Sequence, residues 1–294
     1  MRLLALWLLA LSCAAPEQVP DWPGSGCEST HRAALGHTLV RGEQTVLEPG
    51  LALGVLSPME TGCWPAIVLV PPGIEDGLPI LDTQMGAQLS SAGIVVVAYD
   101  PSGRGASGGE EDYGGPQHQA DLSAVLRWTA DLGAVDPTRV TVLSRSLGVA
   151  AAAGALGGDA SLQVQNLVDL EGPATLPDDL QYVAEQAQET LYQAATGDDW
   201  WLARSASESL GVYPGHYMRI QALSDHATGT WVGHALRLMQ VAEGGAAATA
   251  SLNGVQAESW DYQAVQDNAL EGRVKVDDAR AVVLVLDAVN RGID

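Results

Sequence analysis

Residues 140–154 read Val-Thr-Val-Leu-Ser-Arg-Ser-Leu-Gly-Val-Ala-Ala-Ala-Ala-Gly, and this stretch decides the fold of the chain. A β-branched strand runs directly into Ser-x-Ser-x-Gly, and an alanine-rich helix follows at once. This order is typical of a nucleophile elbow, a sharp turn that presents a serine hydroxyl above the edge of a sheet at a helix N-terminus. Ser144 and Gly148 are small because the tight turn brings neighbouring backbone close. Ser146, at the centre of the turn, is therefore the predicted nucleophile.

Strand and helix patterns alternate on both sides of the elbow. Continuous apolar runs predict buried parallel strands at residues 66–70 and 94–99, and further strands are predicted at 139–143 and 164–170. Helical spacing predicts the intervening helices at residues 80–92, 117–132 and 147–156. The alternation predicts an α/β fold, with a mostly parallel central sheet and helices on both faces. Only helical patterns occur between residues 173 and 215, which predicts a helical cap insertion at about 174–215.

In this order the residues resemble the α/β-hydrolase superfamily, and the dienelactone-hydrolase-like and acyl-peptidase-like branches are most similar. The resemblance is carried by the strand and loop at 68–74, by the loop at 99–109, which is similar to the family's Asp-x-x-Gly-x-Gly-x-Ser, and by the Ser146 elbow. It covers about 65–156 well, and the region after Gly215 agrees only in element order. The family pattern is Gly-x-Ser-x-Gly, so Ser144 departs from it while keeping a small side chain.

The resemblance implies an oxyanion hole made of two backbone N–H groups. One comes from the residue after the nucleophile, Leu147, at a helix N-terminus whose dipole adds to the donor. The other matches the residue after Gly73, which is Ile74. The family commonly has His-Gly in this loop, whereas this chain has Pro72 followed by Gly73. Because only the backbone donor is needed, this change leaves the predicted oxyanion hole intact.

The resemblance also implies an acid and then a histidine, in that order after the serine. Asp225, just past the predicted strand at 217–223, is the first candidate acid, and Glu171 is the alternative. The family histidine should lie beyond about Asn253, where the chain has none. Of the residues available, His234 is the first candidate base.

Two further histidines are alternative bases. His226 directly follows Asp225, and adjacent side chains rarely converge on one hydroxyl, while His118 opens the helix after the glycine-rich loop. Two functions therefore stay open. The first is a serine hydrolase of ester, thioester or amide bonds in a small-molecule or peptide substrate. The second is an inactive α/β-hydrolase-fold module that binds a partner at the cell surface. No dinucleotide fingerprint or metal-ligand set occurs, so no cofactor and no metal are expected.

The N-terminal residues predict an export signal. Arg2 precedes an apolar run at 3–11, which is far shorter than the ~20 residues needed to cross a bilayer. We expect a signal or lipoprotein peptide at 1–15, a tether at 16–36 and the α/β-hydrolase domain at 37–294. The protein is thus predicted to reach the cell envelope, as a periplasmic or outer-membrane lipoprotein, or to be secreted.

Small residues before Cys13 resemble a bacterial lipobox, in which this cysteine is lipidated, and cleavage after Ala14 or Ala15 satisfies the sequence as well. In either case Cys27 and Cys63 are left as a pair in an oxidising compartment. An even number of cysteines in such a compartment predicts a disulfide between them, and two buried free thiols are the alternative.

The charge of the chain limits its partners. The formal net charge is −22, and Lys275 is the only lysine. Phosphate groups bind to Lys and Arg, so the composition excludes nucleic acid and anionic lipid headgroups as partners. Contact with a membrane is expected only through a lipid on Cys13.

Overall fold

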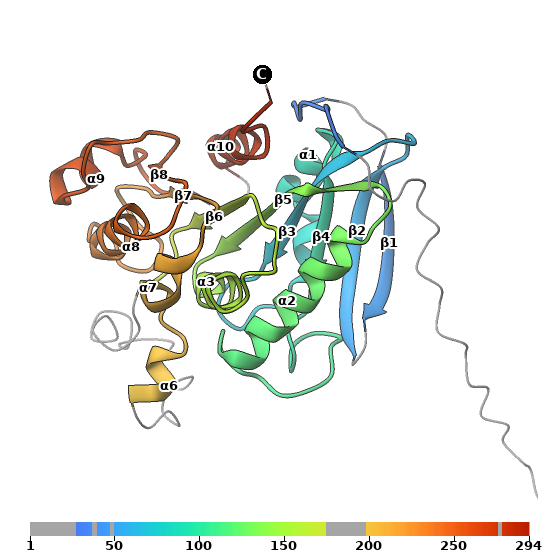
Figure 1. Ribbon diagram of the computed structural model, residues 1–294, viewed down its shortest axis with the longest axis horizontal. Helices are drawn as coiled ribbons and strands as arrows, with labels where there is room; N and C mark the ends of the chain where they lie inside the picture. Colours follow the sequence, from blue (N-terminus) through green and yellow to red (C-terminus); the bar gives the residue numbers. More distant parts are fainter. Residues whose placement is uncertain (1–27, 37–39, 48–49, 175–197, 276–277, 294) are drawn as a thin grey trace, which may run out of the picture.

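The computed structural model describes residues 28–36, 40–47, 50–174, 198–275 and 278–293. An eight-stranded sheet runs through them in the order β1-β2-β4-β3-β5-β6-β7-β8 (Figure 1). The strands are β1 (Val40–Leu47), β2 (Leu51–Pro58), β3 (Trp64–Val70), β4 (Val95–Tyr99), β5 (Val135–Arg145), β6 (Asn166–Leu170), β7 (His216–Ile220) and β8 (Thr249–Leu252). Neighbouring strands from β4 to β8 pair in parallel, whereas β1 with β2 and β2 with β4 are antiparallel.

Helices cover both faces of this sheet (Figure 1). The α-helices are α1 (Gln84–Ser91), α2 (Pro116–Ala130), α3 (Gly148–Gly158), α6 (Asp198–Leu202), α7 (Ala206–Ser209), α8 (Gly233–Gly244), α9 (Tyr262–Asn268) and α10 (Ala279–Val289), and two 3-10 turns are η1 (Leu78–Asp82) and η3 (Leu210–Val212). Side chains of β3 alternate between two cores: Val68 belongs to the core that includes residues of α2, α3 and α8, and Ile67 belongs to the core that includes residues of α1 and α10. A strand with apolar residues at every position is what a sheet covered on both faces requires.

The predicted architecture is confirmed, with differences at element boundaries. The helix expected at 80–92 is divided, because the Thr83 hydroxyl accepts a hydrogen bond from the N–H of Gly86 and so caps α1 separately from η1. The strand before the elbow begins at Val135, four residues before the predicted start at Arg139.

Several sequence expectations lie outside the described residues. These are the signal peptide with Cys13, most of the tether with Cys27, and residues 175–197 of the expected cap. The rest of the expected cap is described and contains α6, α7 and η3. The bridge between Cys27 and Cys63 therefore stays a prediction. Within the described part of the chain, no helix is both long and apolar enough to cross a membrane.

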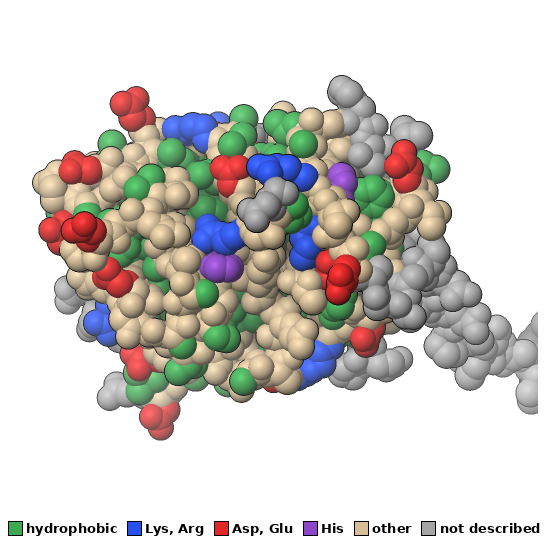
Figure 2. Space-filling model, turned by 45° about the horizontal axis from the view of Figure 1, so that its top comes forward, with side chains coloured by type: hydrophobic (Ala, Val, Ile, Leu, Met, Phe, Trp, Pro, Cys, Tyr) green, Lys and Arg blue, Asp and Glu red, His purple; other side chains and the backbone are tan. Residues whose placement is uncertain are grey.

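The negative charge of the chain is spread over its surface. In the face shown in Figure 2, acidic side chains stand dispersed, mostly toward the outline, with basic side chains between them. Such a distribution is typical of a solvated surface that keeps a protein soluble.

The parallel strands end at one edge of the sheet, and their connections meet there. β5 runs into Ser146, β6 into Glu171, and β7 into the loop that holds His226. The carboxyl edge of an open α/β sheet is the usual place for a ligand site. The topology thus brings three chemically active side chains from three neighbouring strands to one edge.

Candidate active site

Ser146 sits in a strained backbone turn at the end of β5. Its φ is +49°, a left-handed conformation that non-glycine residues rarely adopt. Its N–H donates to the carbonyl oxygen of Leu170 at 2.9 Å, which ties the turn to β6. A Cβ on Gly148 would lie 2.7 Å from the carbonyl oxygen of Pro71, so only glycine lets α3 start this close to the end of β3. This geometry is the predicted nucleophile elbow.

His226 contacts both Ser146 and Glu171. Its Nε2 lies 2.9 Å from the Ser146 Oγ, and its Nδ1 lies 2.8 Å from the Glu171 Oε2. Because a carboxylate only accepts hydrogen bonds, Nδ1 carries the proton and Nε2 is left as the acceptor for the serine hydroxyl. The imidazole side chain is about one-third exposed, whereas the Glu171 side chain is 1% exposed. The imidazole is thus partly open to solvent, and the carboxylate is not.

Backbone N–H groups hold the Glu171 carboxylate in place. Its Oε1 accepts from the N–H of Ala222 at 3.0 Å, and its Oε2 accepts from the N–H of His226 at 3.1 Å. Glu171 itself has a φ of +51°, which turns the chain sharply at the end of β6. The carboxylate therefore fixes both the imidazole ring and the backbone of the loop that carries it.

Asp225, the first candidate acid, does not take that role in the structure. Its Oδ1 lies 3.7 Å from the His226 Nδ1, which is too long for a hydrogen bond. Oδ1 instead accepts from the N–H groups of Ala227 at 2.7 Å and Thr228 at 3.0 Å, and Oδ2 accepts from the Gln221 side chain at 3.0 Å. Asp225 thus shapes the turn that aims its neighbour, His226, at Ser146.

His234, the first candidate base, is also placed elsewhere. It is buried on α8, its Nδ1 accepts from the N–H of Ala174 at 3.0 Å, and its ring meets Trp231 edge-on at 5.0 Å. These contacts pack the helix against the chain that enters the cap segment. His234 is therefore a structural histidine, and the expectation that it serves Ser146 is corrected.

His118 has a structural place as well. Its Nδ1 accepts from the N–H of Gly114 at 3.1 Å, and its Nε2 lies 2.9 Å from the carbonyl oxygen of Ser102, to which it donates. Burial lowers the pKa of His118 more strongly than that hydrogen bond raises it, so the ring is neutral. It ties the glycine-rich loop to the start of α2.

The carboxylate and the histidine that line up with Ser146 each lie one strand earlier than the family pattern predicts. The pattern places the acid after β7 and the histidine after β8; here Glu171 follows β6 and His226 follows β7. The chain order of serine, acid and histidine is unchanged. The available signal was the position of both residues directly after consecutive predicted strands, which brings them to one sheet edge.

The two predicted oxyanion donors lie beside the elbow. Within the described residues, neither the N–H of Leu147 nor that of Ile74 donates to a protein acceptor. Gly73 has a φ of +50°, which turns the chain so that Ile74 stands 51% exposed after the end of β3. Both N–H groups therefore remain candidate donors to an oxyanion.

A buried ion pair lies beneath the site. Arg219 on β7 is fully buried and pairs with Asp169 on β6. The same guanidinium donates to the carbonyl oxygen of Gly172 at 2.8 Å and, through two nitrogens, to the Gln221 Oε1 at 2.7 and 3.0 Å. Gln221 in turn holds Asp225. This cluster links the turn after Glu171 to the loop of His226.

Glu171, Asp225 and His226 are also the one group among the described residues whose ligand atoms lie close enough for a metal ion, within 4.8 Å of one another. The carboxylate oxygens of both acids already accept N–H donors. That donor set fits a hydrogen-bonded histidine better than a metal centre.

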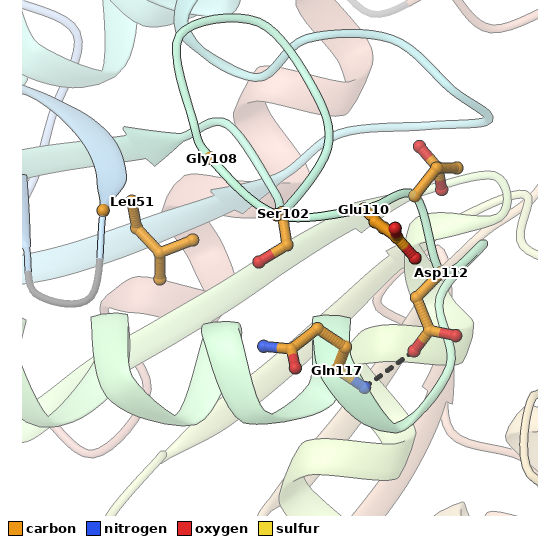
Figure 3. Close-up of a pocket in the computed structure, with 9 residues that line it drawn as sticks. Leu51, Ser102, Gly108, Glu110, Asp112 and Gln117 are labelled. Carbon is orange, nitrogen blue, oxygen red and sulfur yellow. Dashed lines mark hydrogen bonds between the residues drawn. The ribbon is translucent and has the colours of Figure 1, made fainter.

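A hollow of about 470 Å³ lies apart from the elbow, on the outer side of the glycine-rich loop (Figure 3). It is lined by the start of β2 and by loop residues that include Ser102, Glu110 and Gln117. Neither Ser146 nor His226 belongs to its lining. The volume of this hollow therefore says nothing about the substrate of the elbow.

Substituting Asp225 tests its role as the support of the His226 loop. Burial raises the pKa of Asp225, but the hydrogen bonds from Gln221, Thr228 and Ala227 outweigh it, and the pKa lies below its ordinary value. The ionised carboxylate therefore stabilises the fold above the unfolded-state pKa, and this stabilisation is lost as the pH falls through the folded-state pKa. Asp225→Asn is expected to lower the free energy of unfolding by about 1–3 kcal/mol at pH 7.

Urea unfolding of Asp225→Asn and the unsubstituted protein, at pH values between 7 and 3, measures this effect. The difference in free energy between the two should narrow toward low pH. A difference that is constant with pH would show that the charge of Asp225 does not hold the loop.

Residues 50–165 match the model of the X-Pro dipeptidyl-peptidase family S15, a segment that includes Ser146 and ends before Glu171. No curated protein matches the sequence of the chain. The fold is similar to that of a puromycin-hydrolysing peptidase from Mycobacterium tuberculosis, with a TM-score of 0.60 and 15% identity over 87% of this chain. An acylaminoacyl peptidase from Pyrococcus horikoshii has a TM-score of 0.56 and 16% identity over 74% of this chain.

This chain spans only 38% and 36% of the lengths of those two peptidases. An esterase from Pyrococcus furiosus is nearer in size: the match covers 87% of this chain and 94% of the esterase, with a TM-score of 0.61 and 15% identity. The parallel sheet and these likenesses together show that the chain has the α/β-hydrolase fold.

Proposed function

We propose that the protein is a serine hydrolase in which Ser146 is the nucleophile, His226 the general base and Glu171 the residue that orients the base. One observation carries this proposal: His226 lies within hydrogen-bond distance of Ser146 on one side and Glu171 on the other. A serine hydroxyl is unreactive without such a base, and a base is effective when a third group holds its tautomer.

The reaction follows from these contacts. The His226 Nε2 takes the proton from the Ser146 Oγ as that oxygen attacks the carbonyl carbon of the substrate. The carbonyl oxygen becomes an oxyanion and accepts hydrogen bonds from the N–H groups of Leu147 and Ile74. The same Nε2 then gives its proton to the leaving oxygen, nitrogen or sulfur, and the acyl group stays on Ser146. A water molecule, deprotonated by His226, releases the acid and restores the serine.

Glu171 acts through the imidazole. While His226 carries the second proton, the ring is a cation 2.8 Å from the Glu171 carboxylate. A buried carboxylate in this position stabilises the imidazolium and keeps Nε2 directed at the serine. Glu171 is thus a positioning residue, since it touches neither the substrate nor the reacting atoms.

The substrate class is an ester, thioester or amide in a small molecule or peptide. Peptidases and esterases among the similar solved structures support this range. The alternative of an inactive binding module depended on the lack of a histidine after β8. His226 meets that need from the loop after β7, so no observation favours the inactive alternative.

The N-terminal sequence supports a location for this activity. On the strength of residues 1–15 we propose that the protein is exported, either lipidated at Cys13 or cleaved after Ala14 or Ala15. In that compartment Cys27 and Cys63 are expected to form a disulfide.

Labelling with a fluorophosphonate probe tests the proposed function, because the probe reacts only with an activated serine. The unsubstituted protein is expected to be labelled, and Ser146→Ala is expected to lose all labelling. Ser144→Ala is the matched control, since this serine lies two residues away in the same turn, is buried, and donates only weakly to Val168 at 3.5 Å. Absence of labelling on the folded, unsubstituted protein would refute the proposal.

A further inference from the structure

Three aromatic side chains form a wall beside the elbow. Trp200 and Trp201 on α6 meet edge-on with ring centres 4.7 Å apart, and Tyr113 lies 6.4 Å from Trp200. All three are partly buried and pack on Leu147 and Ala150 in the first turn of α3. Leu147 directly follows Ser146, so this aromatic wall contacts the residue next to the proposed nucleophile.

The wall is held from behind by charged side chains. Arg204 stacks on the Trp200 ring with its guanidinium carbon 3.8 Å from the ring centre, and it donates to the carbonyl oxygens of Trp200 and Asp112, each at 3.0 Å. It also pairs with the Asp112 carboxylate. An arginine fixed on this many partners makes the ring a rigid surface.

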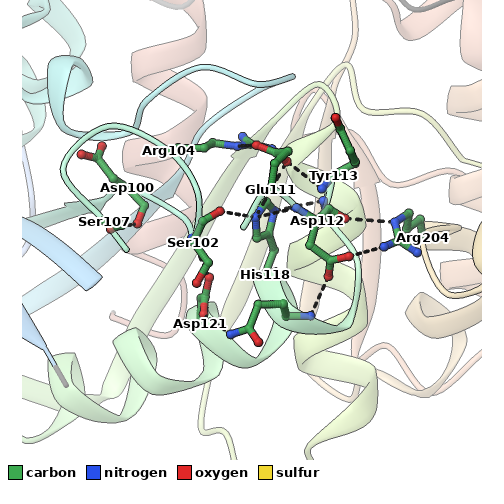
Figure 4. Close-up of polar contacts among 12 residues, drawn as sticks. Asp100, Ser102, Arg104, Ser107, Glu111, Asp112, Tyr113, His118, Asp121 and Arg204 are labelled. Atoms are coloured by element: carbon green, nitrogen blue, oxygen red, sulfur yellow. Dashed lines mark hydrogen bonds and ion pairs between the residues drawn. The ribbon is translucent and has the colours of Figure 1, made fainter. Parts of the chain in front are cut away.

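Tyr113 is fixed by the neighbouring part of the same polar cluster (Figure 4). Its N–H donates to the Glu111 Oε1 at 2.7 Å, and Arg104 holds that carboxylate through two nitrogens at 2.6 and 2.7 Å. The residue has a φ of +51°, and Figure 4 shows its ring directed away from the polar groups. Strain at a non-glycine residue persists where surrounding contacts over-determine it.

The sheet order gives the side of the substrate that the wall meets. His226 and Glu171 follow β7 and β6, on one side of β5, while the loop of Tyr113 follows β4, on the other side. Trp200 and Trp201 belong to the connection between β6 and β7, and they meet this loop through the contact of Trp200 with Tyr113. The leaving group must point toward His226 to receive its proton. The remaining substituent of the tetrahedral carbon is the acyl group, which then points away from His226, toward the loop that follows β4.

We propose that Tyr113, Trp200 and Trp201 form the acyl-binding subsite and select bulky apolar acyl groups, above all aromatic ones. Aromatic rings prefer offset or edge-to-face contacts with other rings, and the near-perpendicular Trp200 and Trp201 offer both orientations. Arg204 is a positioning residue for this subsite. The inference rests on the proposed function, because it needs an acyl group on Ser146.

The test compares the hydrolysis of nitrophenyl acetate and nitrophenyl phenylacetate, which differ only in the acyl group. The release of nitrophenolate is measured, including any initial burst. The expected result is a kcat/KM about tenfold higher for phenylacetate than for acetate, the scale of discrimination that one apolar contact supplies. Trp200→Ala and Tyr113→Ala should bring this ratio near one, because each lowers kcat/KM for phenylacetate more than for acetate. Leu202→Ala is the matched control, since Leu202 lies on the same helix, is 46% exposed and is no part of the wall.

Each outcome decides a separate question. A protein that the fluorophosphonate probe does not label fails the proposed function and, with it, the subsite. A labelled protein with equal rates on both esters overturns the subsite alone, as does an unchanged ratio in the substituted proteins. If Trp200→Ala does not fold, Tyr113→Ala still decides, because that side chain lies on the loop before α2 and leaves α6 intact.

Discussion

Replacing His226 by alanine is expected to lower kcat by about 10⁴-fold or more, the scale seen when the base of a serine hydrolase is removed. The physical reason is that the hydroxyl of Ser146 keeps its proton when no acceptor lies at the position of the His226 Nε2, 2.9 Å away. Binding and oxyanion stabilisation remain, so a small residual rate is expected. Hydrolysis of a nitrophenyl ester and the rate of fluorophosphonate labelling measure the change.

His234→Asn is the matched control for this prediction. The asparagine oxygen can accept the N–H of Ala174 in place of the His234 Nδ1, so the packing of α8 is retained. Its activity should stay within a few-fold of the unsubstituted protein. If His226→Ala kept its activity while His234→Asn lost it, the base would be His234 and the proposed mechanism would be wrong.

Replacing Arg219 by methionine is expected to lower the free energy of unfolding by about 3–5 kcal/mol, because it leaves Asp169 buried without a counter-charge. Burial opposes the charge of Arg219, but nearby Asp169 and Tyr217 outweigh it and raise the pKa above the ordinary value, so the guanidinium is charged. The substitution also leaves the carbonyl of Gly172 and the amide oxygen of Gln221 without a donor. Urea unfolding at pH 7 measures the loss.

An exposed ion pair provides the comparison for Arg219. Arg127 pairs with Asp159 at the surface, its side chain is 54% exposed, and Arg127→Met should cost at most about 1 kcal/mol. Asp169→Asn combined with Arg219→Met should regain part of the loss, since it removes the unpaired charge. If Arg219→Met lowers the free energy of unfolding by no more than Arg127→Met does, the buried pair does not hold the site together.

The fold was predictable because its signals are local. The continuous apolar runs of β3 and β4 indicate strands that are covered on both faces, and the Ser-x-Ser-x-Gly turn around Ser146 can be recognised within a few residues. Boundaries were less predictable. The cap of α1 depends on a single hydroxyl, that of Thr83, which no periodicity reveals.

The partners of Ser146 were predictable only as candidates. The sequence offers Glu171 and His226 as candidates, but the family pattern favours Asp225 as the acid, and His234 is the first candidate base. In the structure, Asp225 turns back to its own loop and does not approach Ser146. Its neighbour His226 still reaches Ser146, because the carboxylate that contacts the imidazole comes from the neighbouring strand.

By itself, then, the sequence determined the α/β fold and the position of the Ser146 turn, since both follow from short patterns along the chain. Only the tertiary structure decided which carboxylate and which histidine line up with Ser146. His226 lies 80 residues from Ser146 and 55 from Glu171, and the side chains meet because three parallel strands end at one edge. The conformations of two loops determine which carboxylate faces the imidazole. Hydrogen bonds from backbone N–H groups to Glu171 and Asp225 fix these conformations.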